Sequence, residues 1–263
     1  NHCMQRPQHI RLRHMLTIPD GDMTAVALLD HLSNHLTANR MTEIRVGIGV
    51  TDTDTAQRDR YQALGFTPSL WLFQCPLPLL NASTDNTVCV RPAAHRDQLP
   101  LSLLFRDYLI GEEQRADFFR LRPDIDWQHL ITAKRRCHDR ILLVAEYNNQ
   151  LSGFIDISLT PSMLSHIRSL ARWGWHRLRR QPSVLPVWRR TASVQGIYTA
   201  PDYQRHGIAT ALLHNAAARA CQQGAIELHA PIWAANHVSQ AFFRRQGLTP
   251  ARLILRRPLR TTG

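Results

Sequence analysis

The sequence has little negative charge, almost no lysine and no long apolar run. Asp and Glu number 20 against 32 Lys and Arg, which gives a formal net charge of +12. Lys134 is the only lysine, so nearly all of the positive charge is arginine, a bias that genome composition can also produce. A positive field still concentrates anionic ligands around the chain. Because no stretch approaches the ~18 uninterrupted apolar residues of a transmembrane helix, no membrane span is predicted.

Paired cysteines are also missing. The five cysteines are odd in number and form neither C-x-x-C pairs nor a metal-type spacing, so we expect reduced thiols, a cytoplasmic location and no metal. A catalytic cysteine is the alternative, but Cys89 falls in a predicted strand and Cys221 in a predicted helix, where buried structural thiols are commoner. The length of 263 residues and the 44% hydrophobic content are sufficient for one or two domains with a buried core.

The most informative segment is QRHGIAT, from Gln204 to Thr210, which fits the pattern Q/R-x-x-G-x-G/A with Gln204, Gly207 and Ala209. A glycine turn that leads directly into a helix presents unpaired backbone N–H groups and the positive end of the helix dipole, which suits a diphosphate. The same order of strand, glycine turn and helix is also a common way for any α/β domain to change direction. The surrounding sequence therefore has to decide between the two interpretations.

The flanking residues predict an ordered set of elements. A strand ends at Pro201, and apolar residues at helical spacing after Gly207 predict a helix that ends at Gly224. A second strand follows at Ile226 and Leu228. Further predicted elements are a helix from Asn236 to Gln246 ended by Gly247, a last strand near Leu253 to Leu255, and an upstream hairpin over Ile141 to Ile157 with Asn148 and Asn149 at its tip.

These segments resemble the coenzyme A half of the Gcn5-related N-acetyltransferases (GNAT). The resemblance rests on "IYTAPDYQRHGIATALL", on "N-x-x-x-x-A-F-F-R-R-Q-G-L" and on the hairpin, and it covers roughly residues 88–259. It implies an α/β fold with a GNAT-type mixed central sheet flanked by helices. It also implies transfer of an acetyl group from acetyl-CoA, as cosubstrate, to a primary amine of a small molecule or protein by direct attack.

The resemblance assigns site residues by position. The Thr199 amide would polarise the thioester carbonyl, and the edge from Ile197 to Thr199 would pair with the pantetheine arm where the neighbouring strands splay. Asn236 opens the following helix close to the cofactor, although a helix N-cap is an equal interpretation. The implied acetyl-CoA-binding residues are Ile197, Tyr198, Thr199, Gln204, Arg205, His206, Gly207, Ile208, Ala209, Thr210, Asn236 and Phe243.

Two positions depart from the family pattern. The tyrosine that often protonates the departing thiolate is replaced by Phe243, which cannot donate a proton, and the frequent carboxylate before Ile197 is replaced by Gln195 and Gly196. A non-catalytic acyl-CoA sensor or nucleic-acid-associated module is therefore the alternative function. Candidates for the missing acid–base role, each more often an ordinary strand residue, are His229, Tyr198, Asp156 and Glu227.

An internal repeat relates the N-terminal part to the C-terminal part. Gly65-Phe66-Thr67-Pro68 matches Gly247-Leu248-Thr249-Pro250, and Glu43-Ile44 matches Glu227-Leu228 at the same relative spacing. Residues 1–80 are thus predicted to be a degenerate, partial second copy of the C-terminal half of the fold, with 81–87 as linker and 88–263 as the acetyltransferase domain. Asp20 and Asp22 would repel a diphosphate, so this copy is expected to be structural.

Residues 161–190 form an insert rich in arginine and tryptophan without acidic residues. Nucleic acid, an anionic membrane surface or an acidic substrate would suit it, and packing on the first copy would explain it equally well. A homodimer is left open. Acidic residues of the early helices of the second copy, where the family builds its acceptor wall, are candidates for contacts with the amine or simple surface charges: Glu112, Glu113, Asp117, Asp124 and Asp126.

Overall fold

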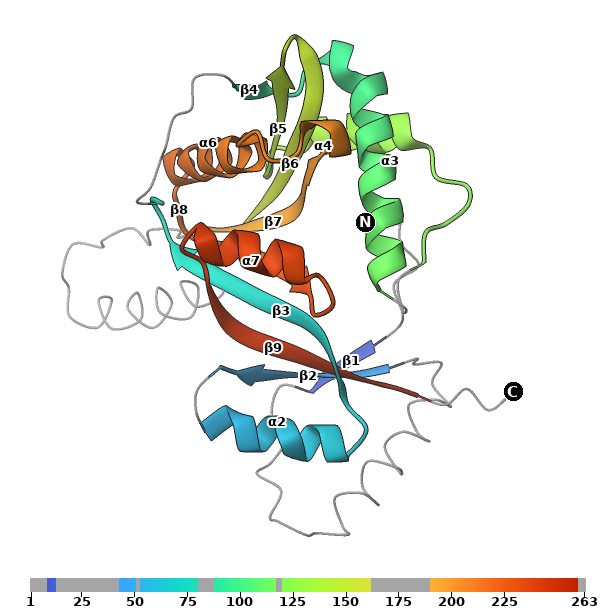
Figure 1. Ribbon diagram of the computed structural model, residues 1–263, viewed down its shortest axis with the longest axis vertical. Helices are drawn as coiled ribbons and strands as arrows, with labels where there is room; N and C mark the ends of the chain where they lie inside the picture. Colours follow the sequence, from blue (N-terminus) through green and yellow to red (C-terminus); the bar gives the residue numbers. More distant parts are fainter. Residues whose placement is uncertain are drawn as a thin grey trace, which may run out of the picture.

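The computed structural model describes residues 9–12, 43–50, 53–79, 88–116, 120–161 and 190–259. Nine strands within these ranges form one mixed sheet in the order β1-β2-β9-β3-β8-β7-β6-β5-β4 (Figure 1). The elements are β1 (His9–Leu12), β2 (Glu43–Gly49), α2 (Thr53–Ala63), β3 (Thr67–Pro76), β4 (Cys89–Pro92), η1 (His95–Asp97), α3 (Gln98–Arg115), α4 (Trp127–Arg136), β5 (Arg140–Tyr147), β6 (Gln150–Pro161), β7 (Arg190–Thr199), η2 (Pro201–Tyr203), α6 (Ile208–Gln222), β8 (Ala225–Trp233), α7 (His237–Arg245) and β9 (Thr249–Pro258).

The predicted mixed α/β sheet is confirmed, and so are the local elements on which that prediction was based. The hairpin of β5 and β6 turns at Asn148 and Asn149, whose φ angles of 51° and 61° are those of a two-residue type I′ turn. Helix α6 begins directly after Gly207, and Gly224 follows its end with a φ of 83°. Glycine tolerates that left-handed conformation without a steric penalty, so the helix ends there.

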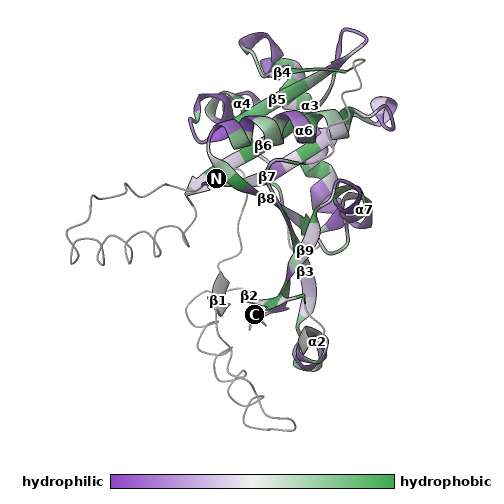
Figure 2. Cartoon of the chain, turned by 90° about the vertical axis from the view of Figure 1, so that its left-hand side faces the viewer, coloured by the Kyte–Doolittle hydropathy of each residue, from purple (hydrophilic) through white to green (hydrophobic). Residues whose placement is uncertain are grey.

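Side chains of the central strands alternate between two cores. Leu143 and Ile155 are buried against α6, whereas their neighbours Leu142 and Phe154 are buried against α3 and α4. The alternation places α6 on one face of the sheet and the α3–α4 pair on the other. In Figure 2, this middle part of the sheet is green, and the outer helices carry the purple, hydrophilic residues. Both faces of β5, β6 and β7 are therefore covered.

A first unit, β2-α2-β3 (residues 43–76), and a second unit, β8-α7-β9 (residues 225–258), are interleaved in the sheet. Strand β3 lies between β8 and β9 and is antiparallel to both. Strand β9 then pairs on its other side with β2, again antiparallel. Each unit thus places its last strand against the first strand of the other unit, and Figure 1 shows β3 and β9 crossing side by side between α7 and α2.

The pairing registers of the two units match. Pro76 of the first unit pairs with Glu227 of the second, and Pro258 of the second unit pairs with Glu43 of the first. Because Pro76 corresponds to Pro258 and Glu43 to Glu227 in the repeat, the two pairings are equivalent. At the centre of the β3–β9 ladder, Trp71 pairs with Leu253. An approximate two-fold axis through this pair would interchange the units.

Hydrogen bonds at the ends of α2 and α7 follow the same correspondence. Gly65 and Gly247 follow these helices with φ angles of 81° and 84°. The next residue of each unit closes the helix with an N–H bond of 3.0 Å, from Phe66 to the Tyr61 carbonyl and from Leu248 to the Phe243 carbonyl. The two units therefore share strand register and helix capping, as the sequence repeat between them predicts.

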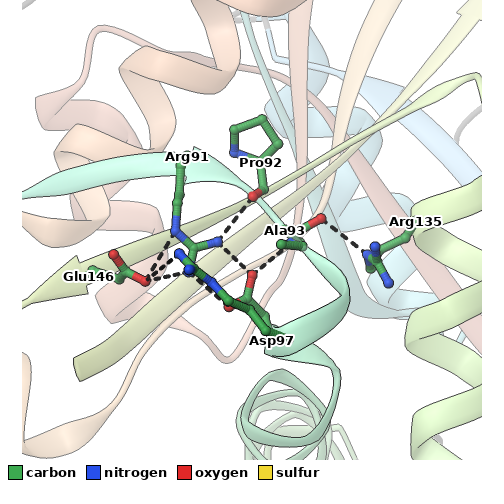
Figure 3. A network of polar contacts seen from close by, with 8 residues as sticks. Arg91, Pro92, Ala93, Asp97, Arg135 and Glu146 are labelled. Carbon is green, nitrogen blue, oxygen red and sulfur yellow. Dashed lines mark hydrogen bonds and ion pairs between the residues drawn. The ribbon is translucent and has the colours of Figure 1, made fainter. Parts of the chain in front are cut away.

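A buried ionic network ties β4 to η1 and β5 (Figure 3). Arg91 Nη1 and Nη2 donate to the two carboxylate oxygens of Asp97 at 2.6 and 2.8 Å, and Arg91 Nε donates to Glu146 Oε1 at 3.1 Å. The Asp97 carboxylate also accepts the Ala94 amide at 2.6 Å. Hydrogen bonds from Arg91 hold the pKa of Asp97 below its usual value, so this carboxylate stays ionised. The network fixes the start of α3.

Several expectations fall outside the described residues. These are the basic insert apart from its two end residues, the 81–87 linker, and Asp20, Asp22 and Asp117. Among the helices that the structure describes, none is both long and apolar enough to cross a membrane.

Candidate active site

The site lies where β7 and β8 separate. The two strands pair in parallel from Arg190 to Ser193 on β7, and the last pair is Ser193 with His229. Both strands continue beyond this pair, β7 to Thr199 and β8 to Trp233. A bulge at Gln195 interrupts the β6–β7 ladder at the point of separation, and bulges re-aim a strand in this way. The predicted splay is present, and among the described strands none pairs with the β8 side of the β7 end.

The glycine turn lies at the open end of β7. Arg205 and Gly207 have left-handed φ angles of 66° and 75°, and the first bond of α6 runs from Ala211 N to Gly207 O at 2.9 Å. In the described part of the chain, the amides of Arg205 to Thr210 donate to no protein acceptor. Six consecutive amides without a protein acceptor in these ranges therefore lie at the positive end of a 15-residue helix, where backbone donors bind anions.

Aromatic contacts hold the glycine turn to the β5–β6 hairpin. The Tyr203 hydroxyl donates to Gln150, and the Tyr147 ring lies 6.3 Å from the Tyr203 ring and 5.0 Å from the His206 ring between centroids. On the adjacent strand β6, Gly153 approaches β7 so closely that a Cβ atom would lie 2.6 Å from the Tyr198 carbonyl oxygen. The turn is thus supported by packing on its outer side.

A cavity of about 1210 Å³ joins the splayed strands, the glycine turn, α7 and one face of α3. Most of the predicted site residues line it. They are Ile197, Tyr198, Thr199, Gln204, Arg205, Gly207, Ile208, Ala209, Thr210, Asn236 and Phe243.

Other predicted residues lie away from this cavity. His206 contacts Tyr147, and His229 lies on β8 with its Nε2 atom 3.4 Å from the exposed carboxylate of Glu227. Asp156 is fully buried, and its carboxylate accepts hydrogen bonds from Lys134 Nζ at 2.6 Å and Arg140 Nε at 2.9 Å. Asp156 is thus a buried, ion-paired carboxylate that is absent from the cavity lining.

Two of the cavity residues have clear structural roles. Asn236 caps α7 by accepting the Ser239 amide at 3.0 Å, so the N-cap interpretation holds together with its position at the cavity. Phe243 is only 2% exposed and belongs to the main core. In contrast, the Oγ1 atom of Thr199 is buried and has no hydrogen-bond partner among the residues that the structure describes. An unpaired buried hydroxyl is costly, and a ligand in the cavity could satisfy it.

The α3 wall of the cavity is the part that the sequence indicated least. Tyr108 and Glu112 are one helical turn apart on α3, and both line the cavity with Arg115. The Tyr108 ring lies on the glycine after the bulge, because a Cβ atom on Gly196 would come within 2.9 Å of Tyr108 Cε1. Its hydroxyl is 3.4 Å from the Gln195 carbonyl oxygen. Tyr108 was not a sequence candidate, because only the folded sheet brings α3 against β7.

Burial changes the acid–base properties of this wall. Desolvation raises the pKa of Glu112 above its usual value, and this effect exceeds the opposing effects of Arg115 and of a hydrogen bond from Trp233. Burial also raises the pKa of Tyr108 well above its usual value, with Glu112 adding to the shift. Tyr198, on β7, has its pKa raised by burial and by the charge of Asp107. A carboxyl group with a raised pKa in a cavity suits proton transfer.

Three of the other acidic residues predicted for the acceptor wall make contacts elsewhere. Glu113 accepts the Leu121 amide at 3.0 Å, Asp126 caps α4 through the His129 amide at 2.9 Å, and Asp124 pairs with Arg122 on the surface. Of the predicted acidic wall, Glu112 lines the cavity. Within the described ranges, no group of three or more His, Cys, Asp or Glu is arranged to hold a metal ion.

The sequence pattern described as the acetyltransferase (GNAT) family matches residues 104–248, which include the larger part of α3, the splayed strands, the glycine turn and α7. The chain belongs to the GNAT acetyltransferase family. No curated protein matches the chain.

Solved structures show the same fold over nearly the whole chain. A GCN5-related N-acetyltransferase from Sphaerobacter thermophilus is similar at 13% identity with a TM-score of 0.58, covering 97% of this chain and 75% of that one. A tandem GNAT protein from the clavulanic acid biosynthesis pathway is similar at 12% identity with a TM-score of 0.52, covering 98% and 77%. A functionally unknown conserved protein from Staphylococcus epidermidis has 14% identity and a TM-score of 0.53, covering 95% and 84%.

Membership of the GNAT family supports acyl transfer as the general activity. The expected general acid is nevertheless absent from its position, because Phe243 stands there in the core. The carboxylate before Ile197 is replaced by the bulge residue Gln195 and by Gly196. The GNAT scaffold is therefore complete at the glycine turn and altered at the acid–base positions.

Proposed function

We propose that the chain is an acetyl-CoA-dependent N-acetyltransferase that transfers the acetyl group to a primary amine of a small molecule or protein by direct attack in a ternary complex. The main support for this proposal is the glycine turn at the start of α6, which lines a cavity of about 1210 Å³. The amides from Arg205 to Thr210 have no acceptor within the described ranges. Backbone donors at a helix N-terminus are the usual protein partner of a diphosphate.

The residues present fit the diphosphate, the pantetheine arm and the acetyl group of this cosubstrate. The amides of the glycine turn hold the diphosphate, and the exposed Arg205 side chain adds a positive charge. The free edge of β7 from Ile197 to Thr199 pairs with the pantetheine arm in the manner of an added strand. The Thr199 Oγ1 atom, buried without a partner, gains a hydrogen bond there. Bound acetyl-CoA would supply an activated acyl group, which the Thr199 amide polarises.

The first test compares binding of acetyl-CoA by wild type and Gly207→Glu in calorimetric titrations. We expect micromolar affinity for the wild type and a loss of about 100-fold or more in the variant, because the carboxylate repels the diphosphate and the residue must adopt a left-handed φ. Ala218→Glu is the matched control, since it adds the same charge on an exposed position of α6. Equal affinity of Gly207→Glu and wild type would contradict the proposal.

The second candidate function is a non-catalytic acyl-CoA sensor or a nucleic-acid-associated module, in which the Arg/Trp-rich insert of residues 161–190 binds the partner. The buried Phe243 at the usual tyrosine position favours it, because this ring cannot protonate a thiolate. A sensor would bind acetyl-CoA and leave it intact in the presence of primary amines. Release of coenzyme A that depends on an added amine would decide for the enzyme.

We infer further that residues 1–80 are a degenerate partial copy of the C-terminal half of the fold, with 81–87 as linker and 88–263 as the acetyltransferase domain. The shared strand register and helix capping of the units support this interpretation. The likeness to the tandem GNAT protein agrees with it. The role of the copy is structural, because β3 completes the sheet beside β8.

A further inference from the structure

The α3 wall combines aromatic rings and carboxylates at the end of the cavity formed by the splayed strands. The ring centroids of Tyr108 and Tyr198 lie 6.2 Å apart, and Trp233 of β8 lines the same cavity. Glu112 and Asp107, both from α3, provide negative charge among these rings. Aromatic faces together with carboxylates are a surface that attracts an ammonium group, in a chain whose net charge is +12.

Glu112 is the carboxylate best placed for chemistry. Its side chain is 15% exposed, it pairs with Arg115 Nη1 at 3.3 Å, and it accepts a hydrogen bond from Trp233. Other charged or titratable residues that line the same cavity are Asp107, Tyr108, Tyr198, Tyr203, Arg205 and Arg245. Asp156 on β6 contributes its charge at Tyr108 but is neutralised by its own lysine and arginine. Glu112 is thus held in position and is open to the cavity.

We propose that Glu112 is the catalytic base of this chain, and that it receives the ammonium group of a cationic primary amine in a cage formed by Tyr108, Tyr198 and Trp233. The proposal rests on the acetyl-CoA-dependent transfer proposed above. It assigns the role of general base to a residue of α3, because the strand position before Ile197 carries no carboxylate. Gly196 contributes by leaving room for the Tyr108 ring on β7.

The step balances in atoms and charge. Glu112 takes one proton from the ammonium group, and the freed nitrogen lone pair forms the bond to the thioester carbonyl carbon. The carbon–sulfur bond breaks, its electron pair goes to sulfur, and the second nitrogen proton ends on the thiolate. Glu112 then releases its proton to solvent. The products are an amide, coenzyme A thiol and one proton, and no oxidant or metal is required.

The test measures amine-dependent release of coenzyme A by wild type, Glu112→Gln and Glu113→Gln, with n-butylamine, phenethylamine, spermidine and a short peptide with a free N-terminus. We expect kcat/KM of Glu112→Gln to fall about 100-fold at neutral pH. In the wild type, kcat/KM should rise with pH through an inflection due to the Glu112 carboxyl group. The pH profile of Glu112→Gln should lack this inflection, while the affinity of the variant for acetyl-CoA stays unchanged. Glu113→Gln is the matched control, because an amide oxygen can still accept the Leu121 amide and the residue is absent from the cavity lining.

The outcomes separate the two proposals. If wild type fails to bind acetyl-CoA, the proposed function fails. If wild type binds acetyl-CoA and acetylates none of the four amines, both the amine cage with Glu112 as base and the proposed transfer activity are contradicted, and the sensor alternative is favoured. If Glu112→Gln transfers acetyl groups with wild-type kcat/KM and an unchanged pH profile, the role of Glu112 is overturned while the proposed function stands.

Discussion

At the scale of single residues, the contrast between buried and exposed carboxylates determines how acid affects the fold. Asp97 has 5% of its side chain exposed and two hydrogen bonds from Arg91, whereas Asp124 pairs with Arg122 at the surface with 62% exposed. Removing one partner of a buried, hydrogen-bonded pair leaves the other charge unsatisfied, but surface pairs contribute little to stability. The pKa of Asp97 is lowered in the folded chain.

The resulting prediction concerns pH. A carboxylate with a lowered pKa in the folded state stabilises the fold above its unfolded pKa of about 3.9, and this contribution is lost as pH falls through the folded pKa. We expect Asp97→Asn to lower the free energy of unfolding by about 1–3 kcal/mol at pH 7, with the difference from wild type shrinking below about pH 4. Urea denaturation across this pH range measures it. Asp124→Asn serves as control, and an equal loss in both variants would speak against the network.

Sequence reasoning located the glycine turn at the start of α6, because a turn that leads into a helix is encoded in consecutive positions. It did not reach Tyr108, whose relevance depends on the approach of α3 to Gly196 in the folded sheet. Glu112 was named only as one of several acids, since burial in the cavity is what distinguishes it from Glu113. The Asp156 candidate was wrong because the sequence did not indicate its two basic partners.

At the scale of elements, β3 is part of the core of the second unit. Phe73 of β3 is fully buried in the cluster that also contains α6 and Phe243, and its neighbour Trp71 packs against the cores of both units. The strand and helix boundaries followed from hydrophobic period and glycine positions. The exchange of β3 and β9 did not, because local patterns specify an element without specifying its partner strand.

We therefore expect Phe73→Ala to destabilise the chain by about 3–5 kcal/mol, the usual loss for a large aromatic side chain removed from a core. Thermal unfolding followed by circular dichroism would measure the change. Gln74→Ala is a control on the same strand, because Gln74 is exposed and its pairing is through the backbone. A loss no greater than that of the control would show that β3 is dispensable to the core.

At the scale of the whole molecule, one continuous sheet joins both units. Without β3, strands β8 and β9 would each present an unpaired edge, and open edges promote aggregation. We predict that residues 88–263 produced alone are insoluble or unfolded. Supplying a chain of residues 1–80 during refolding should restore soluble protein that binds acetyl-CoA. Size-exclusion chromatography and calorimetry would test this, and a stable, acetyl-CoA-binding 88–263 fragment would contradict it.

The interleaving also affects synthesis on the ribosome. Strand β3 ends at Pro76 and its partner β8 begins at Ala225, so roughly 150 residues must be translated before the pairing can form. At about 5–20 residues per second, the nascent chain carries an unpaired apolar strand for on the order of 10 s. Domains usually fold in the order in which they leave the ribosome, but here β3 of the first unit can pair only after the strands of the second unit have been translated. The pairing of β3 with β8 and β9 is therefore delayed until the second unit has been translated, and β3 stays exposed to aggregation until then.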